Sequence, residues 1–336
     1  MMKCRHVLVI MIMLLVSIHC QERPNSSSAQ SPAIPELELL SNNLKDNPDN
    51  ADLWYIRAST FYEVGSYDAA ISDLQSTVRL DSLHIDAWHL LADAYMDYYQ
   101  SRLALETLEK ASTLFSENIS TLLKLAEFQL ILKQYDDALA TIDRIEPIVS
   151  NHPESLFMKG MVCKEAGDTT SAIRYFQRAT AQEPQLIDAW INLGQLFSVV
   201  ESGEAIRYFN AAERIEPSNV PLLHAKAVHL TRVDETQGAL DTYRKLLSHD
   251  PYYADAYYNM GILYLQTDSL DQAREHFELS VKMEPGYARA YYYLGLIAEL
   301  LGHVEEARSH YGQSFKLDPT QKDVEDAQKR LKDVIE

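Results

Sequence analysis

Apolar and polar residues follow one another with a helical spacing along most of this chain, and the whole pattern recurs about every 34 residues. Each unit holds two apolar stripes separated by a short polar break, which predicts two helices joined by a turn. We name them helix A and helix B. Eight units follow in register, and the fifth is one residue shorter than the others: 51–84, 85–118, 119–152, 153–186, 187–219, 220–253, 254–287 and 288–321.

Small and large side chains hold fixed places in these units. Position 20 is alanine in all eight units, and position 8 is always alanine or glycine. Position 4 is large and apolar, and position 24 is Leu, Ile, Phe or Tyr. Two small residues let helix A and helix B of one unit approach closely, and the large residues fill the gaps that remain. The pattern predicts stacked helix pairs and no strand.

The ends of the array and of its helices carry local signals. Asn50, Asn118 and Asn219 precede helix A, where an asparagine side chain caps free backbone amides. Proline at position 32 stops helix B in five units. Residues 35–50 and 322–336 have one apolar face each, which predicts a flanking helix before the array and a capping helix after it.

The unit resembles the tetratricopeptide repeat (TPR), whose pattern is W-x2-L-G-x2-Y…A-x3-F…P. Unit five carries the pattern at these residues: Trp190, Leu193, Gly194, Phe197, Ala205, Phe209 and Pro217. The resemblance covers residues 51–321 of 336. It implies an all-α fold, a right-handed superhelical solenoid of eight helix-turn-helix repeats with a flanking helix at each end, in which helix A lines a concave groove.

The composition narrows the class of partner. The formal net charge is −19, and a surface this acidic repels phosphate backbones, so we expect no nucleic acid partner. Apolar and cationic partners remain. We therefore expect a protein partner that carries apolar and basic residues.

The first residues read as an export signal. Lys3 and Arg5 precede a ten-residue apolar run from Val7 to Val16, which suits the core of a signal peptide. Residues 1–20 end in Cys20 and resemble a bacterial lipoprotein signal, in which the cysteine is lipidated. This predicts a membrane-anchored protein of the bacterial cell envelope. Cleavage by an ordinary signal peptidase, which gives a soluble periplasmic or secreted protein, is the alternative. The Ser- and Pro-rich residues 21–34 then form a tether.

No motif for catalysis stands out. The chain has no phosphate-binding glycine loop, no HExxH and no GxSxG. Its three cysteines form no CxxC pair, and Cys163 falls on a core position of helix A. We therefore expect no enzymatic activity, no cofactor and no metal site.

Groove residues follow from the resemblance, which places positions 2, 5, 9, 12 and 13 of helix A in the concave face. Units one and two present an acidic and aromatic zone there, including Tyr55, Tyr62, His89, Asp93 and Asp97. Later units present a largely apolar zone, in which the predicted partner-binding residues are Leu123, Glu127, Leu130, Ile131, Phe157, Met161, Ile191, Tyr258 and Tyr292. Whether the neighbouring helix A covers positions 9 and 12 stays open.

Two readings of this face compete. In the first, the groove holds a segment of a partner protein, with its apolar part along units three to five. In the second, tyrosines stack on sugar rings, because residues 252–293 hold nine tyrosines, and the protein captures a glycan or small ligand. We favour a non-enzymatic, membrane-tethered scaffold or adaptor that binds a protein segment, and keep the ligand-capturing lipoprotein as the alternative.

Overall fold

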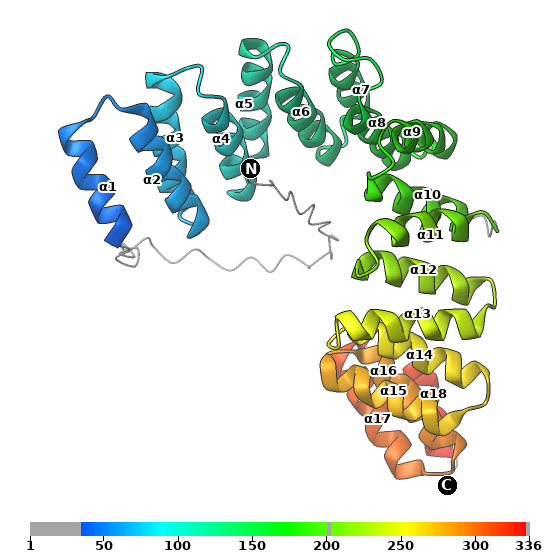
Figure 1. The fold of residues 1–336 in the computed structure, drawn as a ribbon. Helices are drawn as coiled ribbons and strands as arrows, with labels where there is room; N and C mark the ends of the chain where they lie inside the picture. Colours follow the sequence, from blue (N-terminus) through cyan, green and yellow to red (C-terminus); the bar gives the residue numbers. More distant parts are fainter. Residues whose placement is uncertain (1–34, 200–202, 334–336) are drawn as a thin grey trace. The chain divides into compact units, whose positions relative to one another are not determined.

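The described part of the chain, seen in a computed structural model, consists of helices joined by short turns. The structure describes residues 35–199 and 203–333, and contains no strand there. The predicted signal segment, Cys20 and the tether lie outside these residues. Figure 1 labels the eighteen helices, and the chain divides into two compact units between Tyr98 and Tyr99.

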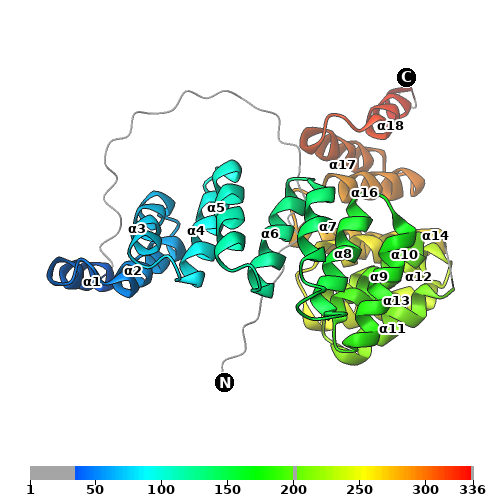
Figure 2. The same ribbon diagram turned by 90° about the horizontal axis from the view of Figure 1, so that it is seen from above.

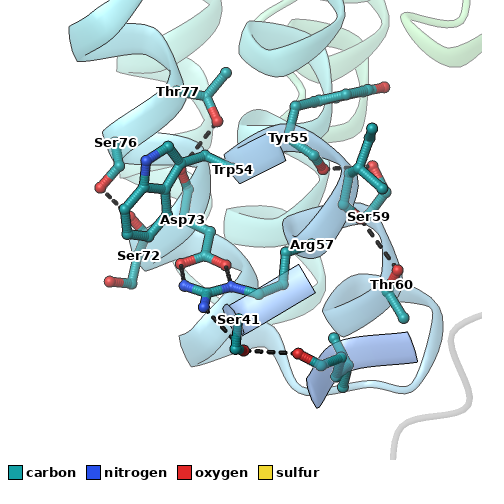
Figure 3. A network of polar contacts seen from close by, with 12 residues as sticks. Ser41, Trp54, Tyr55, Arg57, Ser59, Thr60, Ser72, Asp73, Ser76 and Thr77 are labelled. Atoms are coloured by element: carbon teal, nitrogen blue, oxygen red, sulfur yellow. Dashed lines mark hydrogen bonds and ion pairs between the residues drawn. The ribbon is translucent and has the colours of Figure 1, made fainter. Parts of the chain in front are cut away.

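The first compact unit contains the N-terminal flanking helix, the first repeat and helix A of the second repeat. Its helices are α1 (Pro35–Asp46), α2 (Ala51–Glu63), α3 (Tyr67–Leu80) and α4 (Ile85–Asp97). One arginine joins three of these helices through an ion pair and a hydrogen bond, as Figure 3 shows. Arg57 of α2 donates from Nε and Nη2 to the two carboxylate oxygens of Asp73 in α3, at 2.6 and 2.8 Å, and from Nη1 to Ser41 Oγ in α1, at 3.1 Å.

The second compact unit contains the remaining repeat helices and the C-terminal helix. These are α5 (Ser101–Leu114), α6 (Ile119–Ile131), α7 (Tyr135–Asp143), α8 (Pro153–Glu165), α9 (Thr169–Gln182), α10 (Ile187–Val199), α11 (Ala205–Ile215), α12 (Val220–Arg232), α13 (Thr236–His249), α14 (Ala254–Gln266), α15 (Leu270–Met283), α16 (Ala288–Leu300), α17 (Val304–Leu317) and α18 (Lys322–Asp333). Figure 2 shows the same helices from above.

Helix A of every repeat begins at the first residue of its sequence unit. In five of the eight repeats the side chain of the preceding residue caps the helix. The three predicted asparagine caps form: Asn50, Asn118 and Asn219 each accept from a backbone amide three residues later, at 2.8–3.2 Å. The rings of His84 and His152 do the same in two other repeats, at 3.2 and 3.4 Å.

In the seven repeats whose position 15 the structure describes, the turn after helix A has a left-handed residue at that position. Glycine takes this conformation in three repeats, at Gly65, Gly167 and Gly302, with φ of 74°, 84° and 77°. Four other repeats use a residue with a side chain there, at Tyr99, Lys133, Asp234 and Asp268, with φ of 54–59°. The turn geometry is thus the same whether or not glycine supplies it, although glycine adopts it with less strain.

The core follows the predicted contact between small and large residues. Position 20 alanines are fully buried, and the position 8 glycines face an aromatic ring on helix B. A Cβ on Gly160 would lie 2.6 Å from Cε1 of Phe176, and one on Gly194 would lie 2.6 Å from Cε1 of Phe209. These glycines are therefore required by the packing of the repeat.

Helix B of the third repeat is shorter than its counterparts. The helix α7 ends at Asp143, and turns occupy residues 144–151. Pro147 explains the early end, since its ring clashes with the carbonyl four residues earlier, which is that of Asp143, and it has no amide hydrogen to donate. Ile145 in the turn is still fully buried, so the core of this repeat stays closed.

Candidate partner-binding surface

The A-helix face shows a regular gradation of exposure. Side chains at positions 5, 9 and 12 are mostly half-buried, whereas those at position 13 are exposed in all eight repeats. The cause is contact between the A helices of neighbouring repeats: α2 contacts α4, α6 contacts α8, and α10 contacts α12. This answers the question that the sequence left open, because the neighbouring helix A partly covers positions 9 and 12.

The predicted apolar residues of repeats three and four contribute to the core as well as to the surface. Leu123 and Leu130 pack against the buried cluster of repeat three, and Phe157 and Met161 pack against that of repeat four. All four stay half-buried. Ile131 differs, since 53% of it is exposed at the end of α6. The apolar part of this face is therefore narrower than the residue types alone indicate.

Ile191 is predicted to bind the partner, but the structure places its side chain in the core. It is only 9% exposed and belongs to a buried cluster with Phe209 and Leu222. The reason is that Ile191 lies between its own repeat and the first helix of the next one, so the stacking of repeats covers it. It cannot serve as an anchor for a partner without unpacking the core.

The acidic and aromatic zone of the first compact unit is held in place by polar contacts. Tyr62 of α2 donates from its hydroxyl to Asp97 at the end of α4. Burial and the Asp97 and Asp93 carboxylates raise the pKa of Tyr62, so its hydroxyl stays protonated. The ring of Tyr55 contacts that of His84 in a tilted arrangement, with ring centroids 4.5 Å apart. His89 and Asp93 are half-buried on α4.

Three further residues extend this zone, and the sequence analysis missed them. Tyr67 at the start of α3 lies between the rings of Tyr62 and Tyr98, with centroids 5.7 and 6.4 Å away. The hydroxyl of Tyr98 donates to Asp68 at 2.8 Å. Helix B and the turn after helix A supply these groups, and a search restricted to helix A positions cannot find them. We call Tyr62, Tyr67, Asp68, Asp97 and Tyr98 the acidic–tyrosine cluster.

The tyrosine-rich residues of the last two repeats pack largely on one another. The ring of Tyr258 lies 5.0 Å from that of Tyr287 and 5.9 Å from that of Tyr293. Tyr287 donates to Asp255 at 2.5 Å. Tyr292 contacts Tyr311, at 5.7 Å, and the core cluster to which α18 contributes. Tyrosine rings that contact one another in this way leave less free surface for a sugar, although Tyr252 is 79% exposed.

Two further residues singled out in the sequence are Glu127, on the predicted groove, and Cys163, on a predicted core position. Glu127 is half-buried on α6, beside the half-buried Leu130 and the exposed Ile131. Cys163 is buried, and its burial raises the pKa of the thiol above the ordinary value. Within residues 35–199 and 203–333, no group of three or more His, Cys, Asp and Glu is placed to hold a metal ion.

The fold defines a helical repeat protein, a class that serves as scaffolds for protein interactions. Tetratricopeptide repeat models match residues 37–85, 153–186, 230–300 and 288–321. The chain therefore belongs to the tetratricopeptide repeat family. None of its helices in the described part of the chain is both long and apolar enough to span a bilayer.

Curated relatives and solved structures agree with this assignment. The chain is 24% identical to tetratricopeptide repeat protein 8 of Caenorhabditis elegans, over 65% of the chain and 43% of the relative. It is 25% identical to the peroxisomal targeting signal receptor of Candida albicans, over 70% of the chain and 41% of the relative. The chain thus spans less than half the length of these relatives.

Two solved bacterial structures share the fold. The C-terminal part of a TPR repeat-containing protein from Cytophaga hutchinsonii aligns with a TM-score of 0.58 at 18% identity, covering 71% of this chain and 98% of that one. A tetratricopeptide repeat protein from Parabacteroides merdae aligns with a TM-score of 0.52 at 16% identity, covering 74% and 98%. At these identities the likeness concerns the fold alone.

Proposed function

We propose that this protein is a scaffold without enzymatic activity that binds a Lys- or Arg-bearing segment of a partner protein on its A-helix face and the adjoining start of α3. The acidic–tyrosine cluster carries this proposal. Asp68 and Asp97 are exposed carboxylates, each hydrogen-bonded to a tyrosine whose ring stands beside that of Tyr67. Carboxylates next to aromatic faces suit a cationic side chain, through ion pairing and cation–π contact together.

An exposed apolar side chain lies two residues from Tyr62 in the same compact unit: Val64, which follows α2, is 42% exposed. A partner segment with an apolar residue beside its basic ones would bury such a side chain, and each fully buried one contributes about 1.5–3 kcal/mol. The chain's likeness to a protein named as a targeting signal receptor supports recognition of a protein segment.

A peptide-binding experiment tests the proposal. Short peptides that combine Lys or Arg with Leu or Phe are selected from a random library on the purified protein, and affinity is measured by fluorescence anisotropy. The double variant Asp68→Lys/Asp97→Lys should weaken binding about tenfold or more, because like charges then face each other. The loss should shrink as salt is raised, since ions screen exposed charges.

A matched variant controls for net charge. Glu275→Lys/Glu278→Lys changes the charge by the same amount at exposed sites on α15, a B helix. It should leave affinity within about twofold of the wild type. Equal losses in both double variants would show that bulk charge rather than the A-helix face determines binding, and the proposal would fail.

We also propose that Cys20 carries lipid and anchors the protein to a membrane of the bacterial cell envelope. Support comes from the apolar run before Cys20 and the polar stretch of residues 21–34 after it. Buried acyl chains contribute about 0.8 kcal/mol per CH₂. Cys20→Ala should therefore move the protein to the soluble fraction and abolish labelling by a fatty acid analogue. A wild-type protein that takes up no label would contradict the proposal.

A further inference from the structure

A second surface lies on other helices of the array and has the opposite charge. An open pocket of about 790 Å³ is lined by residues of α10, α11 and α13. Its apolar lining comes from Trp190, Tyr208 and Pro217, and its basic lining from Arg207, Arg214 and Lys245. No residue of the acidic–tyrosine cluster or of the predicted apolar groove lines this pocket.

The aromatic lining is fixed by its own contacts. Tyr208 stacks on Phe197 with ring centroids 5.0 Å apart and lies 6.1 Å from Trp190. Trp190 Nε1 donates to the carbonyl of Pro184 at 3.0 Å, and the hydroxyl of Tyr208 accepts from Gln177 Nε2 at 3.2 Å. These contacts fix both rings in the lining of the pocket, so an apolar side chain that enters it meets a preformed wall.

The charge of the pocket is positive because its carboxylate is already neutralised. Glu213 accepts from Lys226 Nζ and Lys245 Nζ, both at 2.6 Å. Burial alone would raise the pKa of Glu213, but the two lysines lower it below its ordinary value, so the carboxylate stays ionised between two cations. Arg207 is exposed and its contact with Glu204 is long, at 3.8 Å. Arg214 is exposed as well.

The positive surface continues onto α9. This helix contains two arginines and no acidic residue. Arg174 and Arg178 are exposed, and their guanidinium groups lie 5.5 and 5.9 Å from the ring centre of Tyr175. The bond from Gln177 to Tyr208 joins α9 to α11, and the bond from Lys245 to Glu213 joins α13 to α11. In Figure 1 the helices α9, α11 and α13 come in this order along the green to yellow part of the chain, with α10 and α12 between them.

We propose that this pocket and its basic surroundings bind an acidic peptide segment of a partner protein. The argument is charge complementarity: in a chain of net charge −19, two adjacent helices, α9 and α11, carry an arginine-rich face beside a preformed aromatic pocket. Arginine binds carboxylates through paired N–H donors, which favours Asp and Glu side chains over neutral ones. Trp190, Tyr208 and Pro217 receive an apolar side chain of the same segment.

Two synthetic peptides test the proposal on the full chain. One has Asp and Glu on both sides of a central Phe-Leu pair, and the other has Asn and Gln in the same places. The acidic peptide should bind at low salt, and the amide peptide should bind at least about tenfold more weakly. Arg207→Gln/Arg214→Gln should reduce the affinity for the acidic peptide about tenfold or more, and leave the circular dichroism spectrum unchanged.

The control removes the same charge elsewhere. Arg79→Gln/Arg308→Gln changes exposed arginines on α3 and α17, and should keep wild-type affinity. Asp68→Lys/Asp97→Lys, which tests the A-helix face, should not weaken the acidic peptide. If the proposed binding at the acidic–tyrosine cluster fails, the test of the basic pocket is unaffected. If binding at the basic pocket fails, the test of the acidic–tyrosine cluster is likewise unaffected.

Four outcomes would overturn the proposal. The first is equal binding of the acidic and amide peptides. The second is an equal loss of binding in the two arginine double variants, which would mean attraction by bulk charge only. The third is that the protein binds phosphatidylserine vesicles through Arg207 and Arg214 but does not bind the acidic peptide. The surface would then bind a lipid headgroup. The fourth is self-association in sedimentation that the Arg207→Gln/Arg214→Gln variant loses, which would make a second copy of this chain the occupant.

Discussion

Single residues determine how closely the two helices of a repeat approach. Where helix B carries Phe176, Phe209 or Phe277, position 8 is glycine, and a Cβ there would lie 2.6–2.8 Å from the ring. In the first repeat, Ala58 is tolerated because Leu74 replaces the ring. Repeat six is an exception, because it has alanine at position 8 (Ala227) and tyrosine at position 24 (Tyr243). The residues at positions 8 and 24 thus compensate each other in volume in most repeats.

This compensation predicts a coupled pair of substitutions. Gly160→Ala should destabilise the protein by about 1–3 kcal/mol, because the added methyl group overlaps the ring of Phe176. Gly160→Ala/Phe176→Leu should lose less than the sum of the single variants, since it recreates the alanine–leucine pair of the first repeat. Urea unfolding measures all three. Gly312→Ala, at an open site on α17, is the control and should not destabilise. Strictly additive losses would contradict the contact.

At the scale of elements, polar contacts join helices that belong to different repeats. Between α10 and α12, His229 is almost fully buried, and its Nδ1 lies 3.0 Å from Ser198 Oγ. Arg232 Nη1 donates to the carbonyl of Ser198 at 2.8 Å. Burial lowers the pKa of His229 below its ordinary value, and the neighbouring Arg232 lowers it further. The contact between these two A helices therefore favours a neutral histidine.

The neutral histidine predicts a loss of stability in acid. A histidine in the unfolded chain has a pKa of about 6.5, and His229 in the folded chain binds that proton less tightly. The stabilisation is complete above the unfolded pKa and falls as the pH drops through it towards the lower folded pKa. His229→Gln should therefore reduce the difference between urea midpoints measured at neutral and at mildly acidic pH. The same substitution at the exposed His249 is the control, and equal effects of the two variants would contradict this account.

Arg57 links three helices of the first compact unit, through its ion pair with Asp73 in α3 and its hydrogen bond to Ser41 in α1. Asp73 is 4% exposed, so removal of its partner would leave a buried charge. Arg57→Ala should destabilise the first compact unit by about 3–5 kcal/mol, whereas Arg57→Met/Asp73→Leu should recover most of the loss. Proteolysis and urea unfolding of the full chain measure both. If the single variant is as stable as the wild type, the pair does not hold these helices together.

Local signals made the elements of this fold predictable from the sequence, whereas contacts between repeats were not. The caps at Asn50 and Asn118 need only adjacent residues, and so they could be read directly. Pro147 also carried a local signal for the short α7, although the regular register obscured it. Burial of Ile191 depends on how the next repeat stacks, which no single unit encodes.

The candidate site divides in the same way. Tyr62 and Asp97 could be predicted because they hold known face positions of helix A. Tyr67 and Tyr98 join them through the turn and helix B, and their approach depends on the packing of α2, α3 and α4. The pocket beside Trp190 likewise combines three helices from two repeats. Sequence position alone does not bring such groups together.

For the whole molecule, a net charge of −19 conceals an uneven distribution. The acidic side chains of α2 and α4 include Asp52, Asp86, Asp93 and Asp97, while α9 has arginines and no acidic residue. On the two proposals above, each surface binds a segment of the charge opposite to its own. The aromatic side chains of both proposed surfaces are fixed by contacts with neighbouring rings, which lowers the ordering cost of binding for that part of each surface.

Hydrogen–deuterium exchange of the full chain with a selected basic–apolar peptide tests the central claim most directly. The account predicts slower exchange in α2 and α4 and in the turn after α2, because the peptide would cover the acidic–tyrosine cluster. The protection should disappear in Asp68→Lys/Asp97→Lys and persist in Glu275→Lys/Glu278→Lys. Protection confined to B helices such as α9 and α15, with α2 and α4 unchanged, would contradict the assignment of the A-helix face as the site that binds the partner.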